Sequence, residues 1–456
     1  MKKRVLLAAV LAVTVLFGAC KPYVPDELSW LMESGEIVDS IADQSEEPES
    51  VMGDLMNQIE SANEAASESL SSTSDSASDT ASSSDSSNES SGGSSSQSSS
   101  NGSSSQGSSN GSSQGSSSKP SAGGSSSTPS NPQTAQMRGV WISYIELSAF
   151  AGSSQSTFTT KIASMMKTCK QKEINTVFVQ VRPFGDAIYP SKLFPWSRTV
   201  SGQTGKALSY DPMQIIVAQA RAQGLSVHAW INPYRLMNDA NMKLVDDSYA
   251  IGKWYRASNR DDYMIKMSEG TWWLKPGNAE VRSLITAGAK ELLTNYAIDG
   301  IHIDDYFYAA SPSVYGDTTA QAKANNTALV KSLYQTVKSV RSSAQFGVSP
   351  AGGFRADSKL PASDTGYLST DLALWCSKSG YIDYVMPQIY WDYAHTVQPF
   401  TMTLEKWKSF VTAPSVKLYI GLAPYKYGSD IIERQKADSV SGKASGWCLY
   451  RYDNIK

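Results

Sequence analysis

The sequence predicts an α/β protein whose folded part is a (β/α)8 barrel, the TIM-barrel architecture. From about Thr134 to Lys456, apolar runs of strand length alternate with helical patterns, and the length fits one barrel domain. Eight such runs occur, and eight parallel strands close into a barrel, although a doubly wound open sheet is an alternative. The expected strands are Arg138–Ser143, Thr176–Pro183, Ser226–Tyr234, Gly300–Tyr306, Gln345–Ala351, Tyr384–Trp391, Lys417–Tyr425 and Gly446–Tyr452.

The helices between these strands have recognisable ends. Asp211 and Pro212 form an N-cap and a first-turn proline, and Gly224 ends that helix. Asn278 caps another helix, in which apolar residues recur at helical spacing from Val281 to Leu293. The sequence leaves no room for a helix after the eighth strand, so either the last helix is absent or the sequence stops short of it.

The first residues predict export. A basic start at Met1–Arg4 precedes an apolar run from Val5 to Phe17, which is too short to span a bilayer comfortably. The following Gly18-Ala19-Cys20 resembles a bacterial lipobox, in which the cysteine is lipidated and becomes the new N-terminus. We therefore expect a signal peptide at residues 1–19 and a lipid anchor at Cys20 on the extracytoplasmic face of the cell membrane. Ordinary secretion, with Cys20 unmodified, is the alternative.

Two segments without a folded core separate Cys20 from the barrel. Residues 20–66 are acidic with scattered apolar side chains, which favours a solvated, disordered stretch over a short amphipathic helix. Residues 67–132 consist almost entirely of Ser, Gly, Asn, Gln and Thr, a composition that cannot offset the entropy of folding. A flexible chain of this kind, on the order of 60 residues, has an r.m.s. span of about 40–45 Å. We expect a disordered tether that lets the barrel work away from the membrane.

Composition argues against several kinds of partner. The formal net charge of −3 gives no electrostatic case for nucleic acid. Cys169, Cys376 and Cys448 are odd in number and form no C-x-x-C pair, which suggests neither a disulfide framework nor a zinc site, and we expect them to be buried. We expect no cofactor and no metal, and a monomeric domain.

The active site of such a barrel lies at the C-terminal ends of its strands. The two-residue period of a strand indicates which side chains point inward, and polar residues crowd the last inward positions. A barrel interior built for stability alone would carry Val, Ile and Leu there. The predicted inward residues are Phe178, Gln180 and Arg182 on the second strand, His228, Trp230, Asn232 and Tyr234 on the third, His302, Asp304 and Tyr306 on the fourth, and Gln388, Tyr390 and Asp392 on the sixth.

Asp304 is the leading catalytic candidate, because a carboxylate facing the lumen must be hydrogen-bonded, paired or functional. A structural role, with Arg182 or Asn232 as its partner, is the alternative. Asp305 is adjacent, so strand alternation does not let both point inward, and we expect it to support Asp304 or to be catalytic itself. Glycoside hydrolysis uses two carboxyl groups, and the candidates across the mouth are Asp186 and Asp392. Their separation from Asp304 favours inversion.

Aromatic residues point to a polysaccharide. Tyr and Trp number 23 and 11, and many follow strands, where sugar rings would stack on them. Several lie in an insertion between Leu236 and Pro276, which we expect to cover the barrel mouth. His228 and His302 have matching parity on neighbouring strands, but no third ligand accompanies them, so hydrogen bonding is favoured over zinc.

Five motifs in order resemble the glycosyl hydrolase-like family 10 lipoproteins, across essentially all of Arg138–Asp453. The five motifs are Met137-Arg138-Gly139-Val140-Trp141-Ile142, Val181-Arg182-Pro183-Phe184-Gly185-Asp186-Ala187, His228-Ala229-Trp230-Ile231-Asn232-Pro233-Tyr234-Arg235, Asp299-Gly300-Ile301-His302-Ile303-Asp304-Asp305-Tyr306-Phe307 and Met386-Pro387-Gln388-Ile389-Tyr390-Trp391.

This resemblance implies a TIM barrel with a hydrolase site at Asp304 and Asp305. It also implies peptidoglycan glycan strands without stem peptides as the leading substrate. The fourth-strand motif is similar to that of family 18 chitinases as well, but Tyr306 stands where those enzymes have their glutamate acid. The substrate-binding candidates on these motifs are Arg182, Asn232, Tyr234, Arg235, His302, Tyr306, Gln388, Tyr390 and Trp391.

Three functions remain open at this point. The first is a glycoside hydrolase acting on a β-linked, N-acetylated glycan, with Asp304 as nucleophile or base. The second is a non-catalytic glycan-binding lipoprotein whose acid has been lost. The third is hydrolysis of a plant or host polysaccharide, which shares the chemistry of the first. The number of polar groups in the lumen favours hydrolysis over simple binding.

Overall fold

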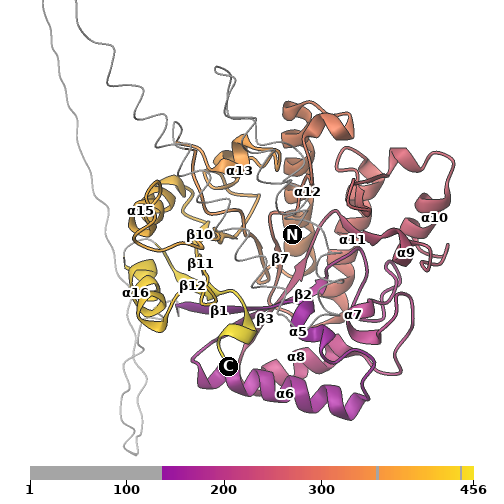
Figure 1. Ribbon diagram of the computed structural model, residues 1–456, viewed down its shortest axis with the longest axis horizontal. Coiled ribbons are helices and arrows are strands. Elements are labelled where there is room, and N and C mark those ends of the chain that lie inside the picture. Colours follow the sequence, from indigo (N-terminus) through magenta and orange to yellow (C-terminus); the bar gives the residue numbers. More distant parts are fainter. Residues whose placement is uncertain (1–135, 356–358, 442–443) are drawn as a thin grey trace, which may run out of the picture. The chain divides into compact units, whose positions relative to one another are not determined.

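The computed structural model describes residues 136–355, 359–441 and 444–456. The predicted signal peptide, the lipid anchor at Cys20, the acidic segment and the linker lie outside the described residues. Figure 1 shows the strands at the centre of the described part, with helices around them.

The strands form one parallel sheet that closes on itself. Its order is β10-β9-β8-β7-β3-β2-β1-β12-β11, and β10 and β11 are two pieces of one strand, separated by Tyr419. Because β10 pairs with β9 and β11 pairs with β12, nine segments make eight barrel strands, and the predicted (β/α)8 barrel is confirmed over the open sheet. The segments are β1 (Met137–Ile142), β2 (Thr176–Arg182), β3 (Ser226–Ile231), β7 (Gly300–Ile303), β8 (Gln345–Val348), β9 (Tyr384–Val385), β10 (Lys417–Leu418), β11 (Ile420–Leu422) and β12 (Gly446–Leu449).

The helices surround these strands (Figure 1) and begin where the sequence indicates. Asp211 caps α8 through the Gln214 amide, and Asn278 caps α11 through the amides of Glu280 and Val281. The longer helices are α6 (Gln155–Gln171), α8 (Pro212–Ala222), α11 (Ala279–Asn295), α12 (Thr319–Val340), α15 (Phe400–Phe410) and α16 (Ser429–Val440). Short elements in the loops are α5 (Tyr144–Ser148), α7 (Arg198–Ser201), η3 (Pro312–Tyr315), α13 (Ala362–Thr365) and α14 (Leu372–Trp375).

Several strands are shorter than predicted, and two irregularities matter for the site. The predicted sixth strand stops at Val385, and Pro387 follows, which has no N–H to donate to the ladder. Only Gln388 continues the pairing, through single bridges to Ala351 and Gly421. On β2 the register with β3 shifts between Gln180 and Arg182, which marks a β-bulge.

Buried aromatic rings and the Cys448 thiol, rather than aliphatic side chains alone, fill the barrel lumen below Asp304. Trp141 Nε1 donates to His302 Nε2 at 3.1 Å, and the Tyr384 hydroxyl lies 3.1 Å from Nδ1 of both His302 and His228. The acceptor role of His302 Nε2 puts its proton on Nδ1, so Tyr384 accepts from His302 and donates to His228. Burial lowers the pKa of His228 to about 4 and that of His302 well below its ordinary value, so both rings are neutral. Gly347 makes room for Tyr384, since a Cβ there would lie 2.1 Å from the tyrosine ring.

The expected insertion forms a small unit between β3 and α11. Its antiparallel sheet has the order β4-β6-β5, with β4 at Arg235–Asn238, β5 at Met264–Lys266 and β6 at Thr271–Leu274. The helices α9 (Asp239–Met242) and α10 (Ala250–Arg256) and the 3-10 turn η2 (Arg260–Asp262) complete it.

The segment after β12 is tied to the loop after β1. Only a 3-10 turn, η4 (Tyr452–Asn454), follows the last strand. Arg451 Nη1 contacts Glu146 Oε1 at 2.9 Å, and both side chains are buried. The free Cys169, Cys376 and Cys448 are buried, as expected. In the described part of the chain, no helix is both long and apolar enough to cross a membrane.

Candidate active site at the mouth of the barrel

Asp304, just past the end of β7, is held by side chains of the third strand. Its Oδ2 atom accepts from Trp230 Nε1 and from Asn232 Nδ2, each at 2.9 Å. Its Oδ1 atom accepts from the amide of Tyr306 at 3.3 Å. The residue is 4% exposed, so the prediction that it faces the lumen is confirmed.

A chain of amides fixes the orientation of Asn232 against Asp304. The backbone N–H of Tyr144 donates to Gln180 Oε1 at 2.9 Å, which leaves the Gln180 Nε2 group to donate to Asn232 Oδ1 at 2.6 Å. The Asn232 Nδ2 group must then face Asp304. Because a backbone N–H can only donate, the direction of each later hydrogen bond follows from it. Asn232 had been predicted to bind substrate, but it is fully buried and its side chain holds Asp304.

Asp305 also reaches the mouth, which strand alternation did not predict. β7 ends at Ile303, so the alternation no longer applies two residues later. Asp305 is half-buried, and the side chain of Gln388, from the sixth strand, hydrogen-bonds to it. Asp305 therefore offers a carboxyl group that is more accessible than that of Asp304.

The two carboxyl groups share an environment that favours their protonated forms. Burial raises the pKa of Asp304 to about 7, and the charge of Asp305 adds to that rise. Hydrogen bonding from Trp230 and the charge of Arg235 limit it. Burial raises the pKa of Asp305 to about 6, opposed by hydrogen bonds that include the one from Gln388. Near pH 6.5 the pair thus holds roughly one proton and one negative charge.

Arg235, whose positive charge lowers the pKa of Asp304, lies inside a cage of aromatic rings. Its Cζ atom lies 4.2 Å from the ring centre of Phe184, 5.0 Å from that of Tyr306 and 5.7 Å from that of Tyr144. Trp273 of the insertion stacks on Tyr306, with ring centres 6.0 Å apart and planes 19° apart. The insertion therefore contributes to the wall of the mouth, in agreement with the expectation that it covers this end.

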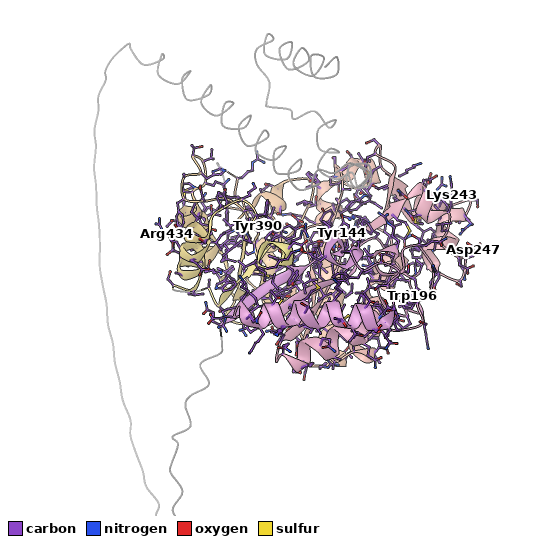
Figure 2. All side chains as sticks on the ribbon, turned by 60° about the horizontal axis from the view of Figure 1, so that its bottom comes forward. Tyr144, Trp196, Lys243, Asp247, Tyr390 and Arg434 are labelled. Atoms are coloured by element: carbon purple, nitrogen blue, oxygen red, sulfur yellow. The ribbon has the colours of Figure 1, made fainter. Side chains whose placement is uncertain are left out.

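A cluster of three tyrosines lines the opposite side of the mouth. Tyr390 lies 5.7 Å from Tyr450 and 6.4 Å from Tyr425 between ring centres, and Tyr425 is 37% exposed. The charge of Asp305 acts on Tyr390, so the cluster is near the carboxyl pair. Figure 2 shows Tyr144 and Tyr390 in the upper half of the view, with Lys243 and Asp247 of the insertion at its right edge. Sequence reasoning missed Tyr425 and Tyr450 as site residues, although their places after the seventh and eighth strands were a usable signal.

Arg182 does not face the lumen, which corrects the sequence prediction. The bulge on β2 pairs Arg182 with Ile231, an outward residue of β3. Its Nη2 atom donates to the carbonyls of Asn232 and Pro233, and its guanidinium lies over the ring of Phe194 at 4.8 Å. Arg182 therefore holds the start of the loop after β3 by hydrogen bonds and packs on Phe194 of the loop after β2, inside the outer core.

Tyr234 and His302 are also wrongly predicted as substrate contacts. Both are fully buried. Tyr234 follows the end of β3 at Ile231 and packs in the outer core, so strand parity does not apply to it. His302 does face the lumen, but two residues below Asp304, where Trp141 and Tyr384 bond both ring nitrogens.

Asp186 and Asp392, the predicted partners of Asp304, are engaged in their own loops. Asp186 is 2% exposed, accepts from the Phe184 amide at 3.0 Å and is hydrogen-bonded by Ser197. Asp392 accepts from the Ala394 amide at 2.9 Å in the loop before α15. Both are aspartates that hold a turn through a nearby backbone N–H. The carboxyl group whose charge acts on Asp304 is that of Asp305.

The remaining candidates divide between the mouth and its supports. Tyr306 and Arg235 form the wall described above, and Tyr390 belongs to the tyrosine cluster. Gln388 links Asp305 to the Ser349 carbonyl, to which its Nε2 atom donates at 3.0 Å. Trp391 is half-buried and packs near His395 with ring centres 5.6 Å apart. Within the described ranges, no group of three or more His, Cys, Asp or Glu side chains could hold a metal ion.

The sequence that forms this barrel, with its two aspartates at the mouth, matches a known protein family. The sequence profile of the glycosyl hydrolase-like 10 family matches residues 136–439. The chain belongs to this family.

Relatives of this chain in Escherichia coli and Bacillus subtilis are named glycosyl hydrolases. Glycosyl hydrolase DigH of Escherichia coli K12 is 35% identical over 280 residues, which cover 56% of this chain and 63% of the relative. Glycosyl hydrolase YngK of Bacillus subtilis 168 is 29% identical over 323 residues, covering 65% of this chain and 62% of the relative. The matched region thus spans somewhat less than two thirds of either relative.

Among solved structures, the glycoside hydrolase domain of PgaB (BpsB) from Bordetella bronchiseptica is similar to this family member. It superimposes with a TM-score of 0.48 and 12% sequence identity, over 70% of this chain and 95% of that domain.

Proposed function

We propose that the protein hydrolyses glycosidic bonds of an N-acetylated cell-wall glycan, with peptidoglycan glycan strands lacking stem peptides as the leading substrate. The observation that carries this proposal is the pair Asp304 and Asp305 at the barrel mouth, whose pKa values are raised to about 7 and about 6. Carboxyl groups kept partly protonated near neutrality are what glycosidic bond cleavage requires of a general acid. A protein that only binds glycans would gain nothing from burying two such groups side by side.

The adjacency of the pair favours one type of mechanism. Consecutive Cα atoms lie about 3.8 Å apart, so both side chains approach a bound sugar from the same strand end. Mechanisms with two carboxyl groups place them on either side of the glycosidic bond. Asp186 and Asp392, which would supply the far side, are held in their loops. An N-acetylated sugar can provide the missing nucleophile itself, through the carbonyl oxygen of its 2-acetamido group.

In the proposed reaction, Asp305 is the general acid. The higher pKa of Asp304 keeps the shared proton mainly on Asp304, so the reactive form is the minor one in which that proton has moved to Asp305 and Asp304 is the carboxylate. It gives its proton to the glycosidic oxygen as the bond to C1 breaks, and the acetamido oxygen forms a new bond to C1. The resulting cyclic oxazolinium ion carries a positive charge. Asp305, now a carboxylate, takes a proton from water as that water attacks C1 and opens the ring. The anomeric configuration is retained, and the earlier inference of inversion does not apply to this pair.

Asp304 supports this reaction as the carboxylate of the pair. Two donors occupy its Oδ2 atom, whereas its Oδ1 atom accepts the longer bond from the Tyr306 amide, which leaves acceptor capacity for the acetamido N–H. Its carboxylate would hold the acetamido group against C1 and stabilise the oxazolinium charge. Arg235 keeps part of this pair ionised, since its positive charge lowers the pKa of Asp304.

The substrate proposal is tested by comparing matched glycans. The full chain should release reducing ends from denuded peptidoglycan strands, and the same strands after chemical removal of the N-acetyl groups should resist cleavage. Equal cleavage of both would refute participation of the acetamido group. Absence of cleavage of the acetylated strands, together with binding to them, would favour the non-catalytic glycan-binding alternative. Cleavage of a plant or host polysaccharide instead would keep the chemistry and change the substrate.

We also propose that the protein works from a lipid anchor at Cys20 on the extracytoplasmic face of the membrane. The support is the order of a basic start, an apolar run and a small-residue site before Cys20. Cys20→Ser should move the protein from the membrane fraction to the soluble fraction. Retention of this variant on washed membranes would contradict the anchor.

A further inference from the structure

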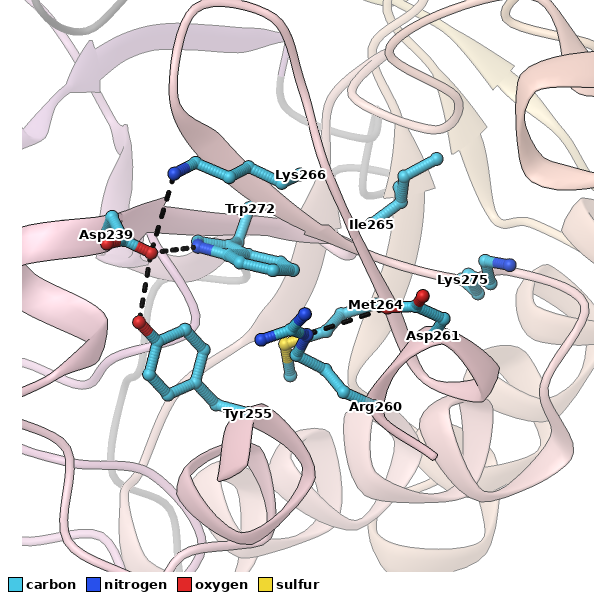
Figure 3. A pocket seen from close by; sticks show the side chains of 9 residues that line it. All are labelled: Asp239, Tyr255, Arg260, Asp261, Met264, Ile265, Lys266, Trp272 and Lys275. Atoms are coloured by element: carbon cyan, nitrogen blue, oxygen red, sulfur yellow. Dashed lines mark hydrogen bonds and ion pairs between the residues drawn. The ribbon is translucent and has the colours of Figure 1, made fainter. Parts of the chain in front are cut away.

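The insertion carries a second hollow, distinct from the barrel mouth, with a volume of about 600 Å³. Trp272 and Trp273 are neighbours on β6, so their side chains point to opposite faces of the small sheet. Trp273 stacks on Tyr306 at the mouth, and Trp272 lines the hollow. The other lining residues, drawn in Figure 3, are Asp239, Tyr255, Arg260, Asp261, Met264, Ile265, Lys266 and Lys275.

Arg260 is held in a defined orientation at the centre of this hollow. Its Cζ atom lies 4.7 Å from the ring centre of Trp272 and 6.0 Å from that of Tyr255. Figure 3 shows its guanidinium beside these two rings, which meet each other edge to face with centres 5.4 Å apart. The Nε atom of Arg260 is buried and has no hydrogen-bond partner among the described residues, so the planar fork of the guanidinium has donors left for a planar acceptor such as a carboxylate.

The acidic side chains of the hollow do not use up its positive charge. The Asp239 carboxylate accepts from Tyr255 Oη at 2.9 Å and from Trp272 Nε1 at 3.1 Å, and it pairs with Lys243 at 3.0 Å and Lys266 at 3.6 Å. Arg260 meets Asp261 only at 3.5 Å. Lys275 has no ion-pair partner among the residues that the structure describes. Three cations therefore line the hollow against two carboxylates, one of which is fully engaged.

We propose that this hollow is an accessory binding site for a carboxylate carried by a sugar of the glycan. The inference rests on the proposed function in taking the ligand to be a glycan. Hydrolysis of the amide that joins a stem peptide to a sugar leaves a free carboxylate on that sugar, so denuded strands present this group repeatedly. Arg260 would bind the carboxylate through two N–H groups, with Lys275 and Lys266 beside it. The side chain of Ile265 lies on the same face of the small sheet as that of Trp273, its partner in the ladder, so the apolar surface offered to the sugar comes from the rings of Trp272 and Tyr255.

The site would let the protein distinguish denuded strands from strands that still carry peptides. An amide-linked sugar carboxyl has no charge, so it loses the interaction with the guanidinium. The insertion would thus hold a strand by a sugar other than the one being cleaved, because Trp272 and Trp273 point to opposite faces.

Binding is measured by calorimetry on the full chain with Asp305→Asn, which prevents turnover. The probes are denuded strands and the same strands with their carboxylates converted to methylamides. The free carboxylates should tighten binding roughly five- to tenfold, and this preference should shrink as salt is raised. Adding Arg260→Gln should abolish the preference, and Lys275→Gln, which touches no packed ring, should reduce it. Lys243→Gln is the matched control, because Lys243 pairs with Asp239 but does not line the hollow, and it should leave the preference intact.

Several outcomes would overturn the proposal. They are equal binding of the charged and amidated strands, an unchanged preference in both Arg260→Gln and Lys275→Gln, and displacement of the strands by inorganic phosphate at the concentrations that the free carboxylates require. The last outcome would indicate an unselective anion site. Binding with the expected preference but no hydrolysis by the wild-type chain would leave this site standing and refute the proposed function alone.

Discussion

The indole N–H of Trp230 donates to Asp304 Oδ2 at 2.9 Å, which links the third barrel strand to the end of the fourth. Asn232, two residues further along the third strand, donates to the same oxygen. Charge on Asp304 is thus stabilised by two fixed donors while burial opposes it. This balance keeps the pKa of Asp304 near neutrality, at about 7, and it defines how the site should respond to pH and to mutation.

The pH dependence of hydrolysis should be narrow. With pKa values of about 6 and about 7, the pair holds one proton and one charge only in a small window. Below pH 6 the carboxylate is lost to protonation, and above pH 7 the acid is lost to ionisation. The value of kcat/KM on denuded strands should peak near pH 6.5 and fall on both sides. A profile that is flat from pH 5 to 8 would contradict these assignments.

Asn232→Asp should shift the alkaline limb of that pH profile to higher pH. The change replaces a donor to Asp304 with a second negative charge, which raises the pKa of Asp304 further. We expect a shift of about one unit or more, together with a loss of activity because Asp304 is no longer held in place. Asn175→Asp is the control, since Asn175 precedes the start of β2 at the opposite end of the barrel. An unchanged profile for Asn232→Asp would show that this hydrogen bond does not tune the pair.

Asp304→Asn should stabilise the fold above neutral pH. The folded-state pKa of Asp304, about 7, lies above the unfolded value of about 3.9, so the folded state binds its proton more tightly. Stability is therefore lost as pH rises between about 4 and 7, and asparagine removes this loss. We expect a gain of about 1–3 kcal/mol in the free energy of unfolding at pH 8 that disappears near pH 4. Denaturant unfolding at both pH values tests this, and a variant less stable than wild type at pH 8 would contradict it.

The buried ion pair of Glu146 and Arg451, which ties the segment after the last strand to the loop after the first, should contribute to the free energy of unfolding. Glu146→Gln removes the negative charge that pairs with the buried Arg451 guanidinium, so the free energy of unfolding should fall by about 2–4 kcal/mol. Glu405→Gln, which removes an exposed carboxylate paired with Lys408, should lower the free energy of unfolding by less than about 0.5 kcal/mol. Equal effects of the two substitutions would show that the pair does not matter for stability.

The fold could be predicted from the sequence because each strand and helix carries its own signal. Apolar runs, the Asp211 and Asn278 caps and the count of eight strands are local features, and the structure confirms them. Asp304 was predicted to face the lumen for the same reason, since β7 is regular up to the residue before it.

The rest of the site depends on departures from regular strands, which the sequence did not reveal. A bulge turns Arg182 out of the lumen, and the end of β3 at Ile231 frees Tyr234 from its expected parity. Asp305 reaches the mouth because β7 has ended, so adjacency did not exclude it. Asp186 is hydrogen-bonded by the Phe184 amide and by Ser197 because of how one loop folds, and the two-residue period of a strand says nothing about such a loop.

The most direct test of the account compares Asp305→Asn, Asp304→Asn and Asp392→Asn on denuded strands and on an aryl N-acetylglycoside with a good leaving group. Loss of the general acid in Asp305→Asn should lower kcat on strands roughly 100- to 10,000-fold and much less on the aryl substrate, which needs little protonation. Asp304→Asn should be severely impaired on both substrates, and Asp392→Asn should stay within about threefold of wild type, since its carboxylate only holds its own turn. Full activity of Asp305→Asn on strands, or loss of activity in Asp392→Asn alone, would contradict the assignment of Asp304 and Asp305 as the catalytic pair.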